Sequence, residues 1–221
     1  MEDVLDLYAE PYDPQRPQVC CDESPVQLIN ETRQPLPARP GQPARYDYAY
    51  RRAGTANLFL CVQPWRGWRH VNVTARRTKG DFAVQMQELV DVHCPEADVI
   101  RLVVDNLNTH TPAALYETFR AEEARRLTRK LEFHYTPKHG SWLNMAECEF
   151  AVLTQQCLDH RLPDITTLGR EIAAWQAPRN RHQTRINWGF STTDARVKLK
   201  RLYPSVSNGA RRPETELGRA A

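Results

Sequence analysis

Hydrophobic residues in this chain gather in short runs that predict β-strands. The run from Ile100 to Val104 is apolar at four of its five positions and ends in polar turn formers, a pattern typical of a buried strand in a mostly parallel sheet. Runs rich in β-branched and aromatic residues, bounded by turn residues, predict further strands. The predicted strands cover 17–29, 46–52, 55–64, 68–77, 99–105 and 131–137, with turns at 52–54 and 64–67.

Apolar residues at helical spacing predict helices between and after these strands. Residues 81–94, 141–158 and 165–176 each have one apolar face. A further helix opens at Thr111, whose hydroxyl can cap it and which is followed by proline, and it continues through 121–130. An initial antiparallel meander followed by alternating helices and strands predicts a mixed five-stranded sheet flanked by helices, an α/β fold.

The length and composition fit one large domain with short appendages. The chain has 221 residues, of which 41% are hydrophobic and 26% charged, as in ordinary globular proteins. Residues 1–16 are predicted to be a linker, 17–205 the domain, 34–46 an extended Pro-rich loop and 206–221 a disordered tail. No apolar stretch reaches the roughly 18–20 residues that cross a bilayer, and no secretion signal is present. We therefore expect a soluble cytoplasmic protein without a membrane partner.

Six cysteines stand at positions 20, 21, 61, 94, 148 and 157. None forms a CxxC pair, and none has the Cys/His spacing of a zinc site. We expect these residues to be free thiols, mostly buried, that act as small hydrophobic side chains.

Positive charge is concentrated near the end of the chain. Residues 179–201 hold seven basic residues and one acid, so this stretch carries +6 and the rest of the chain −3, for a total of +3. This asymmetry suits a polyanionic partner such as nucleic acid. A solvated basic helix would have the same composition, so both interpretations stay open.

Acidic residues occur at three places where a ligand could be held. Asp105 ends the buried strand, and ligands collect at the carboxyl ends of parallel strands. A helical wheel of about 100° per residue places Glu147 at the edge of the packed face of its helix and Glu149 on the outward side. The first strand offers Asp22 and Glu23, which point to opposite faces, and the pattern alone does not choose between them.

Two explanations of these acids remain open at this point. Three carboxylates that converge without basic partners would bind hard divalent cations such as Mg²⁺ or Mn²⁺, which prefer oxygen ligands. An Asp at a strand end, however, often caps a helix or forms a turn, and a Glu at a helix edge is often solvated or ion-paired.

Five motifs follow one another over roughly residues 15–205. They are CCDESPVQL, GQPARYDYAYRRAG, VVDNLNTHT, HYTPKHGSWLNMAECEF and RINWGFSTTDARVKLKRLYPS. In this order they make the chain resemble the DDE transposases of bacterial insertion sequences related to the mariner superfamily. The resemblance implies a ribonuclease H-like fold and an enzyme that cuts phosphodiester bonds at transposon ends and transfers the strand to target DNA.

The resemblance also implies an active site. The family's three acids correspond to Asp22, Asp105 and Glu147. They would be catalytic and would bind two Mg²⁺ or Mn²⁺ ions. Asn106 and His110 would support the metal ligands or contact phosphate, and Asn144 would act beside them. His110 is equally suited to a capping role at the start of the following helix.

The partners implied by the resemblance are DNA and a second copy of the chain, as a homodimer. The candidate DNA contacts are Lys138, His139, Arg179, Arg181, Arg185, Arg196 and Lys198. Phosphate contacts need such basic residues rather than a sequence-reading motif. Trp188 and Phe190 lie within the basic run and would either meet DNA or pin the C-terminal segment to the sheet.

Family members normally carry N-terminal helix-turn-helix modules that recognise the transposon ends. No such pattern precedes the first catalytic strand, so we expect a catalytic domain alone. Two other functions remain open: a ribonuclease H-like nuclease acting on other nucleic acid, and a non-catalytic remnant that binds DNA or a partner transposase.

Overall fold

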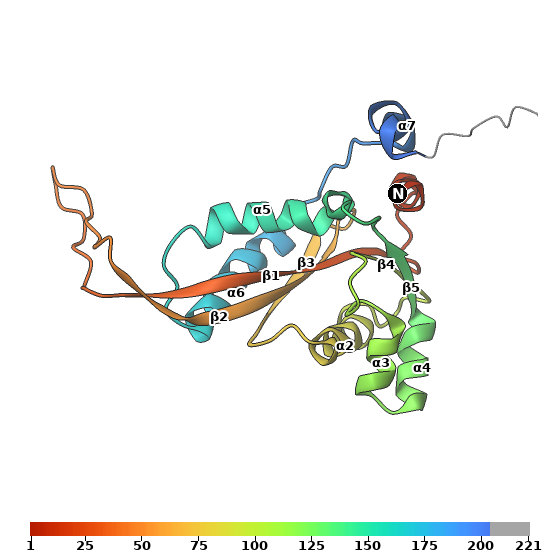
Figure 1. Ribbon diagram of the computed structural model, residues 1–221, viewed down its shortest axis with the longest axis horizontal. Coiled ribbons are helices and arrows are strands. Elements are labelled where there is room, and N and C mark those ends of the chain that lie inside the picture. Colours follow the sequence, from red (N-terminus) through yellow and green to blue (C-terminus); the bar gives the residue numbers. More distant parts are fainter. Residues whose placement is uncertain (204–221) are drawn as a thin grey trace, which may run out of the picture.

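A twisted five-stranded sheet forms the centre of the computed structural model, which describes residues 1–203 (Figure 1). The strands are β1 (Gln18–Glu31), β2 (Tyr50–Gln63), β3 (Trp68–Thr74), β4 (Ile100–Val104) and β5 (Leu131–Tyr135). They lie in the order β3-β2-β1-β4-β5, with β1, β2 and β3 antiparallel and β1, β4 and β5 parallel. The predicted mixed five-stranded sheet is confirmed. The tail predicted at 206–221 lies outside the described residues.

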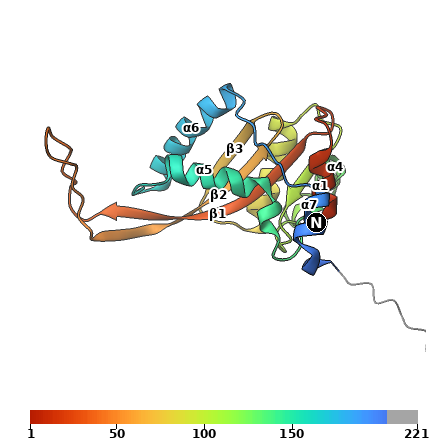
Figure 2. The same cartoon turned by 90° about the horizontal axis from the view of Figure 1, so that it is seen from above.

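Helices cover both faces of this sheet (Figures 1 and 2). Helices α5 and α6 lie on one face, and α2, α3 and α4 lie on the other. The helices are α1 (Glu2–Ala9), α2 (Lys79–Glu88), α3 (Pro112–Thr118), α4 (Ala121–Lys130), α5 (Met145–Cys157), α6 (Ile165–Arg181) and α7 (Thr192–Lys198). A π-helical turn, Leu89–His93, follows α2, and 3₁₀ turns occupy Ser141–Leu143 and Lys200–Leu202. Within residues 1–203, every helix is too short or too polar to cross a membrane.

The central strands divide their side chains between two hydrophobic cores. On β1, Cys20 packs with α5 and α6, whereas Val19 and Cys21 pack with α2, α3 and α4. On β4, Val103 joins the first core and Val104 the second. This alternation follows from the two-residue period of a strand and explains why β4 is buried at all of its positions.

The structure joins two predicted strands into one and divides one predicted helix into two. The segments predicted as separate strands at 46–52 and 55–64 form the single strand β2, because Gly54 adopts φ 105° and the pairing with β1 shifts register instead of turning. The helix predicted from Thr111 through 130 is two helices, because Phe119 and Arg120 both adopt extended backbone angles.

The first residues of the chain are not the linker predicted for 1–16. Residues 2–9 form α1, whose Val4, Leu5, Leu7 and Tyr8 are all buried. The Tyr8 hydroxyl donates to Leu143 O at 2.8 Å. Helix α1 is therefore part of the hydrophobic core, and its contact with Leu143 supports the turn before α5.

The prediction that all cysteines are free thiols is wrong for one pair. Cys21 and Cys61 lie directly opposite each other on β1 and β2, with 4.3 Å between their Cα atoms, and form a disulfide. The other four cysteines are free, and Cys20, Cys94 and Cys157 are buried as expected. The disulfide joins the two strands immediately beside Asp22.

The edge strand β3 is covered by α6. The Asn180 side chain donates to Arg69 O at 2.7 Å and accepts from Arg69 N at 2.8 Å, and Gln176 accepts from Val71 N at 3.0 Å. Gln176 and Asn180 are four residues apart and so lie on one helical face. Backbone groups that would be free on an edge strand are thus bonded by helix side chains.

Strands β1 and β2 continue beyond the body of the protein as an arm, residues 29–52 (Figures 1 and 2). Its end contains the Pro-rich loop predicted at 34–46, with only isolated bridges between Leu36 and Arg45 and between Arg39 and Gln42. Arg161, which follows α5, donates to Asp47 O at 2.8 Å and pairs with Glu31. This arginine therefore fixes the base of the arm to the body.

Candidate active site

The parallel pairing of β1 and β4 brings Asp22 and Asp105 together. Cys20 lies beside Val103 in the register, and the two aspartates each follow two residues later. Side chains two residues apart share a face of a sheet, so both aspartates belong to the face that α5 covers. This register places Asp22, rather than Glu23, on the face of the sheet that holds Val103 and that Asp105 continues.

Asn144 brings the start of α5 to the same place. Its side chain is fully buried, donates to Cys21 O at 2.9 Å and accepts from Ala146 N at 3.1 Å. It is thus the N-cap of α5 and a tie to β1 at the residue before Asp22. Glu147 is the third residue of the helix and is exposed, and its carboxylate is close enough to Asp22 to contribute to the raised pKa of Asp22.

Replacing Asn144 should therefore affect both folding and the site. We expect Asn144→Ala to lower the free energy of unfolding by about 2–3 kcal/mol, because it removes a cap and leaves a buried carbonyl unpaired. Asn144→Asp keeps the cap acceptor but loses the donor to Cys21 O, and should lie between wild type and the alanine variant. Urea unfolding measures both, and equal stability of all three proteins would contradict the assigned role.

The electrostatics at Asp22 suit a bound cation. Burial, together with the carboxylates of Asp105 and Glu147, raises the pKa of Asp22 to about 7, although the N–H of Glu23, 2.8 Å from Asp22 Oδ1, opposes the shift. Among residues 1–203, no basic side chain forms an ion pair with Asp22 or Glu147. Asp22 and Glu147, two acids without a basic partner in the described chain, fit the oxygen-ligand chemistry of Mg²⁺ and Mn²⁺.

The raised pKa of Asp22 gives a pH dependence with a definite sign. Because an unfolded aspartate titrates near about 3.9, the folded protein binds more protons between that pH and about 7, and the free energy of unfolding falls as pH rises through this window. In metal-free protein, Asp22→Asn should be more stable than wild type by about 1–3 kcal/mol near pH 8, with no difference near pH 4.

Urea unfolding in a chelating buffer across this pH range measures the difference. Saturating Mn²⁺ should shrink or reverse it, because the cation favours the ionised carboxylate of the wild-type protein. A difference that does not change with pH would show that Asp22 is ordinarily ionised.

His110 connects Asp105 to the neighbouring acid Glu23. Its Nδ1 contacts Asp105 Oδ1, its Nε2 lies 2.8 Å from both oxygens of Glu23, and its ring packs 4.8 Å from that of Phe82. Burial alone would lower the pKa of His110, but the Asp105 and Glu23 carboxylates outweigh it and raise the pKa to about 10. The His110 imidazolium therefore contacts Asp105 through one ring nitrogen and Glu23 through the other.

This position bears on two of the roles considered for His110, contact with phosphate and capping of α3. The side chain is 1% exposed, so it cannot reach a phosphate, and Thr111 rather than His110 is the N-cap residue of α3. Asn106, in contrast, is exposed in the loop after β4. The contact of Glu23 with His110 was not predicted from the sequence. There, Asp22 and Glu23 were compared only as alternative metal ligands.

A family model of the DDE superfamily endonucleases matches residues 17–169, more than two thirds of the chain. The chain belongs to this family of endonucleases. No curated protein is similar enough in sequence to be matched with it. The matched residues of this DDE endonuclease chain include all three acids, Asp22, Asp105 and Glu147, and every strand of the sheet.

Solved structures of the Mos1 transposase share the fold. The paired-end complex with the left transposon end has a TM-score of 0.53 and 16% identity, covering 76% of this chain and 51% of that chain. The paired-end complex with Mn has a TM-score of 0.53 and 16% identity, covering 81% of this chain and 54% of that chain. The strand transfer complex has a TM-score of 0.51 and 18% identity, covering 79% of this chain and 50% of that chain. These similarities confirm the ribonuclease H-like α/β fold. The DDE endonuclease chain spans about half the length of these transposases.

In the DDE endonuclease chain, Glu149 does not face outward as the helical wheel predicted. It is 1% exposed, and its Oε1 lies 2.8 Å from Arg69 Nε and 3.0 Å from Arg179 Nη2. Arg69 comes from β3 and Arg179 from α6, where its guanidinium also lies over the ring of Trp175. The wheel failed because it placed the packed face of the helix beside Glu147, which is exposed, and two arginines compensate the buried Glu149. The buried positions of α5 are Met145, Ala146, Glu149, Phe150, Leu153 and Cys157.

The candidate DNA contacts of the DDE endonuclease chain occupy different surroundings. Lys138 and His139 are exposed and, with Asp105 and Asn106, line a cavity of about 340 Å³ at the carboxyl ends of β4 and β5. Arg179 is 17% exposed and already paired with Glu149. The remaining candidates are exposed near the end of the described chain: Arg181, Arg185, Arg196 and Lys198. Contact with DNA stays a prediction for all of them.

The two aromatic residues of the basic run pack against protein. The Trp188 ring lies 5.4 Å from that of Tyr8 on α1, and the Phe190 ring lies 5.5 Å from that of Trp142 in the turn before α5. Arg196 on α7 pairs with Glu2 on α1 at 2.7 Å. Of the two interpretations of Trp188 and Phe190, the structure supports pinning of the C-terminal segment, with α1 and this turn as the anchor.

Proposed function

We propose that this chain is the catalytic domain of a metal-dependent DNA transposase of a bacterial insertion sequence. The observation that carries the proposal is that Asp22, within β1, lies beside the end of β4 and the N-terminus of α5, where nearby acids and burial raise its pKa to about 7. Such a site is suited to holding cations, because burial of Asp22 without a basic partner is costly.

In this proposal Asp22, Asp105 and Glu147 hold two Mg²⁺ or Mn²⁺ ions. When bound, the ions would supply activation of the attacking oxygen and stabilisation of the leaving oxygen at a phosphodiester. Asp105 is kept in position by His110, which contacts one of its oxygens. Glu147 is kept in position by the capped first turn of α5.

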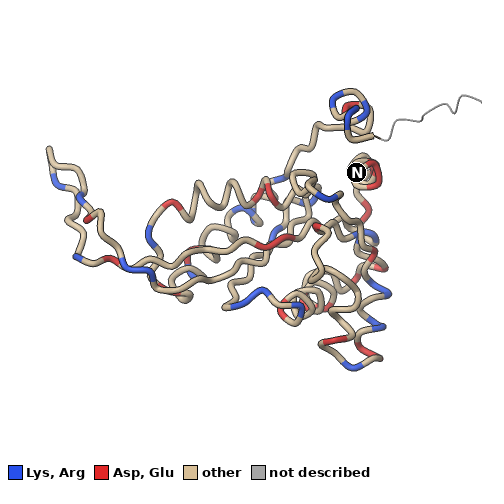
Figure 3. The backbone as a smooth tube through the Cα atoms, viewed as in Figure 1, with Lys and Arg blue, Asp and Glu red and all other residues tan. Residues whose placement is uncertain are grey.

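The proposed substrates are transposon ends and target DNA. Lys138 and His139 stand beside Asp105, where they could contact phosphate. The arm carries five exposed arginines, Arg33, Arg39, Arg45, Arg51 and Arg52, against only two acids, as Figure 3 illustrates along its backbone. Exposed Tyr46, Tyr48 and Tyr50 lie among them, and alternating basic and aromatic residues suit contact with nucleic acid. We further propose that the protein acts as a cytoplasmic homodimer.

The test is cleavage of labelled DNA that carries the ends of the element, with Mn²⁺ or with a chelator. We expect wild type to cut at the ends only with the metal and Asp105→Asn to be inactive. Asp159→Asn, an exposed acid after α5, is the matched control and should be as active as wild type. Supercoiled plasmid serves as a second substrate, because its nicking does not require recognition of the ends.

The outcomes separate the competing functions. Cutting at the ends with joining to target DNA supports the transposase, and metal-dependent cutting of any nucleic acid without joining indicates a nuclease of other specificity. Folded wild type that cuts neither substrate would contradict the proposal and leave a non-catalytic DNA-binding remnant.

A further inference from the structure

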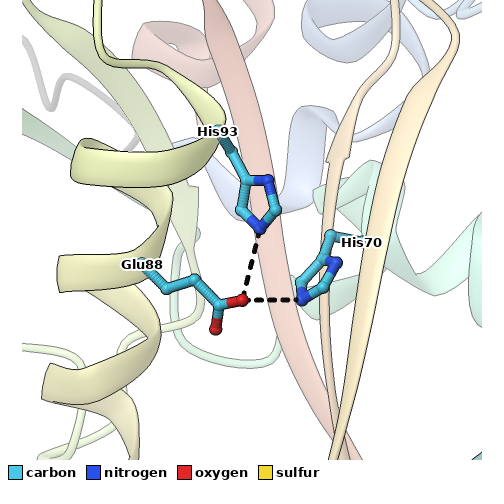
Figure 4. Close-up of side chains that lie close together, drawn as sticks. All are labelled: His70, Glu88 and His93. Atoms are coloured by element: carbon cyan, nitrogen blue, oxygen red, sulfur yellow. Dashed lines mark ion pairs between the residues drawn. The ribbon is translucent and has the colours of Figure 1, made fainter.

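A second group of ligand-type side chains lies away from the three acids, where α2 ends beside β3. His70 comes from β3, Glu88 is the last residue of α2, and His93 ends the π-helical turn Leu89–His93. In Figure 4 both imidazoles point toward the same carboxylate. His70 pairs in the sheet with Cys61, whose side chain faces α2, so this group lies on the face opposite Asp22.

The distances within this group match those around a tetrahedral metal ion. Glu88 Oε1 lies 3.3 Å from His70 Nε2 and 3.5 Å from His93 Nε2, and the three ligand atoms all lie within 4.8 Å of one another. Zinc with bonds of about 2.0–2.1 Å at tetrahedral angles places neighbouring ligand atoms about 3.4 Å apart. The two distances to Glu88 match this spacing, and the two imidazole nitrogens lie no more than 4.8 Å apart.

The hydrogen bonding of the group is incomplete without a ligand. Both Nε2 atoms are shielded from solvent, and their contacts with Glu88 Oε1, at 3.3 and 3.5 Å, are long for hydrogen bonds. Two buried imidazole nitrogens thus share one carboxylate oxygen, and neither is bonded at the usual distance. A cation bound between them would satisfy all three atoms.

Neighbouring side chains hold the three ligands in place. Asn72 donates to Glu88 Oε2 at 2.6 Å and to Gln85 Oε1 at 2.8 Å, which leaves Oε1 of Glu88 directed at the imidazoles. Trp68 lies against both rings, with centroids 6.4 Å from His70 and 4.9 Å from His93. Such outer contacts orient ligands in known metal sites. Burial and the adjacent His70 lower the pKa of His93, which favours the neutral ring.

We propose that His70, Glu88 and His93 form a binding site for one Zn²⁺ or a similar borderline divalent cation, separate from the site at Asp22, Asp105 and Glu147. Two imidazoles and one carboxylate suit such a cation, whereas three carboxylates suit Mg²⁺ or Mn²⁺. The three side chains are 17–31% exposed, which leaves room for water as a fourth ligand. The bound ion would join the edge strand β3 to the end of α2.

Titration of metal-free protein with Zn²⁺ by calorimetry, and with Co²⁺ by visible absorption, tests the proposal. We expect one tight site per chain with the absorption of four-coordinate cobalt, and the same site in Asp105→Asn, in which the acidic site is impaired. His93→Gln should weaken binding at least about a hundredfold, and Glu88→Gln at least about tenfold. His160→Gln, at an exposed histidine, is the matched control and should bind like wild type.

Thermal unfolding shows whether the variants are folded and provides a second measure of Zn²⁺ binding. Without metal, His93→Gln should melt close to wild type, and Zn²⁺ should raise the melting temperature of wild type but not of the variant. Glu88→Gln can still accept the bond from Asn72, and it replaces His93→Gln if that variant does not fold. Absence of Zn²⁺ binding in folded wild type, or unchanged binding in the folded variants, would overturn the proposal.

Discussion

Glu147→Gln should slow metal-dependent DNA cleavage by at least about a thousandfold while leaving the free energy of unfolding within about 1 kcal/mol of wild type. The first expectation rests on the proposed function: cations at a reacting phosphate are worth several kcal/mol, and each 1.4 kcal/mol is a factor of ten in rate. The second follows from exposure of Glu147 at the N-terminus of α5, where a carboxylate adds only about 0.3–1 kcal/mol to helix stability.

Single-turnover cleavage of plasmid and end-bearing DNA, together with urea unfolding, measures both quantities. The Mn²⁺ concentration that gives half-maximal cleavage should also rise, which would separate loss of a metal ligand from loss of DNA binding. A variant that keeps more than about a tenth of the wild-type rate at saturating Mn²⁺ would remove Glu147 from the proposed metal ligands.

Glu149→Gln, two residues further along the same helix, should show the opposite pattern, with a large loss of stability and little loss of activity. The substitution leaves Arg69, whose side chain is fully buried, and Arg179 without a counter-charge. Removal of one partner of a buried ion pair destabilises proteins by about 3–5 kcal/mol, and we expect a loss of this size in the free energy of unfolding. Below its melting temperature the variant should still cleave DNA, because Glu149 pairs with β3 and α6 rather than with the acidic site.

The fluorescence of the five tryptophans during urea unfolding provides the measurement. Glu122→Gln, at an exposed acid on α4, is the control for loss of one negative charge and should cost less than about 0.5 kcal/mol. A loss below about 1 kcal/mol in Glu149→Gln would mean that water or other groups compensate the two arginines. Glu147→Gln thus tests the proposed metal site, and Glu149→Gln tests the buried ion pairs that hold α5 to β3 and α6.

The strands and long helices were predictable because their burial repeats at the period of the element. The strand Ile100–Val104 was visible as an apolar run, and the capped helices at 79–88 and 145–157 as apolar faces. Helix α1 was not predictable in this way. It has only eight residues among prolines and acids, and contacts with Leu143 and the C-terminal segment, distant in sequence, bury its apolar side chains.

The candidate site was predictable only in part, because some of its features depend on contacts between residues distant in sequence. The end of β4 identified Asp105 as a ligand candidate, because topology alone directs strand ends to one edge. The strand pattern alone did not choose between Asp22 and Glu23, because their faces are defined by the register of β1 against β4. The burial of Glu149 depends on Arg69 and Arg179, about 80 and 30 residues away in sequence. Pairings of this kind leave no local pattern in the chain.

The disulfide between Cys21 and Cys61 has a consequence for the covalent connectivity of the protein. The bond closes a loop that contains the whole arm, residues 29–52. Exposed loops are preferred sites of protease attack, and the Pro-rich end of the arm is such a loop. A single cut there would leave two fragments that remain one molecule under oxidising conditions and separate only after reduction and unfolding. Asp22 and the residues that complete its site would therefore stay linked even when the chain between β1 and β2 is broken.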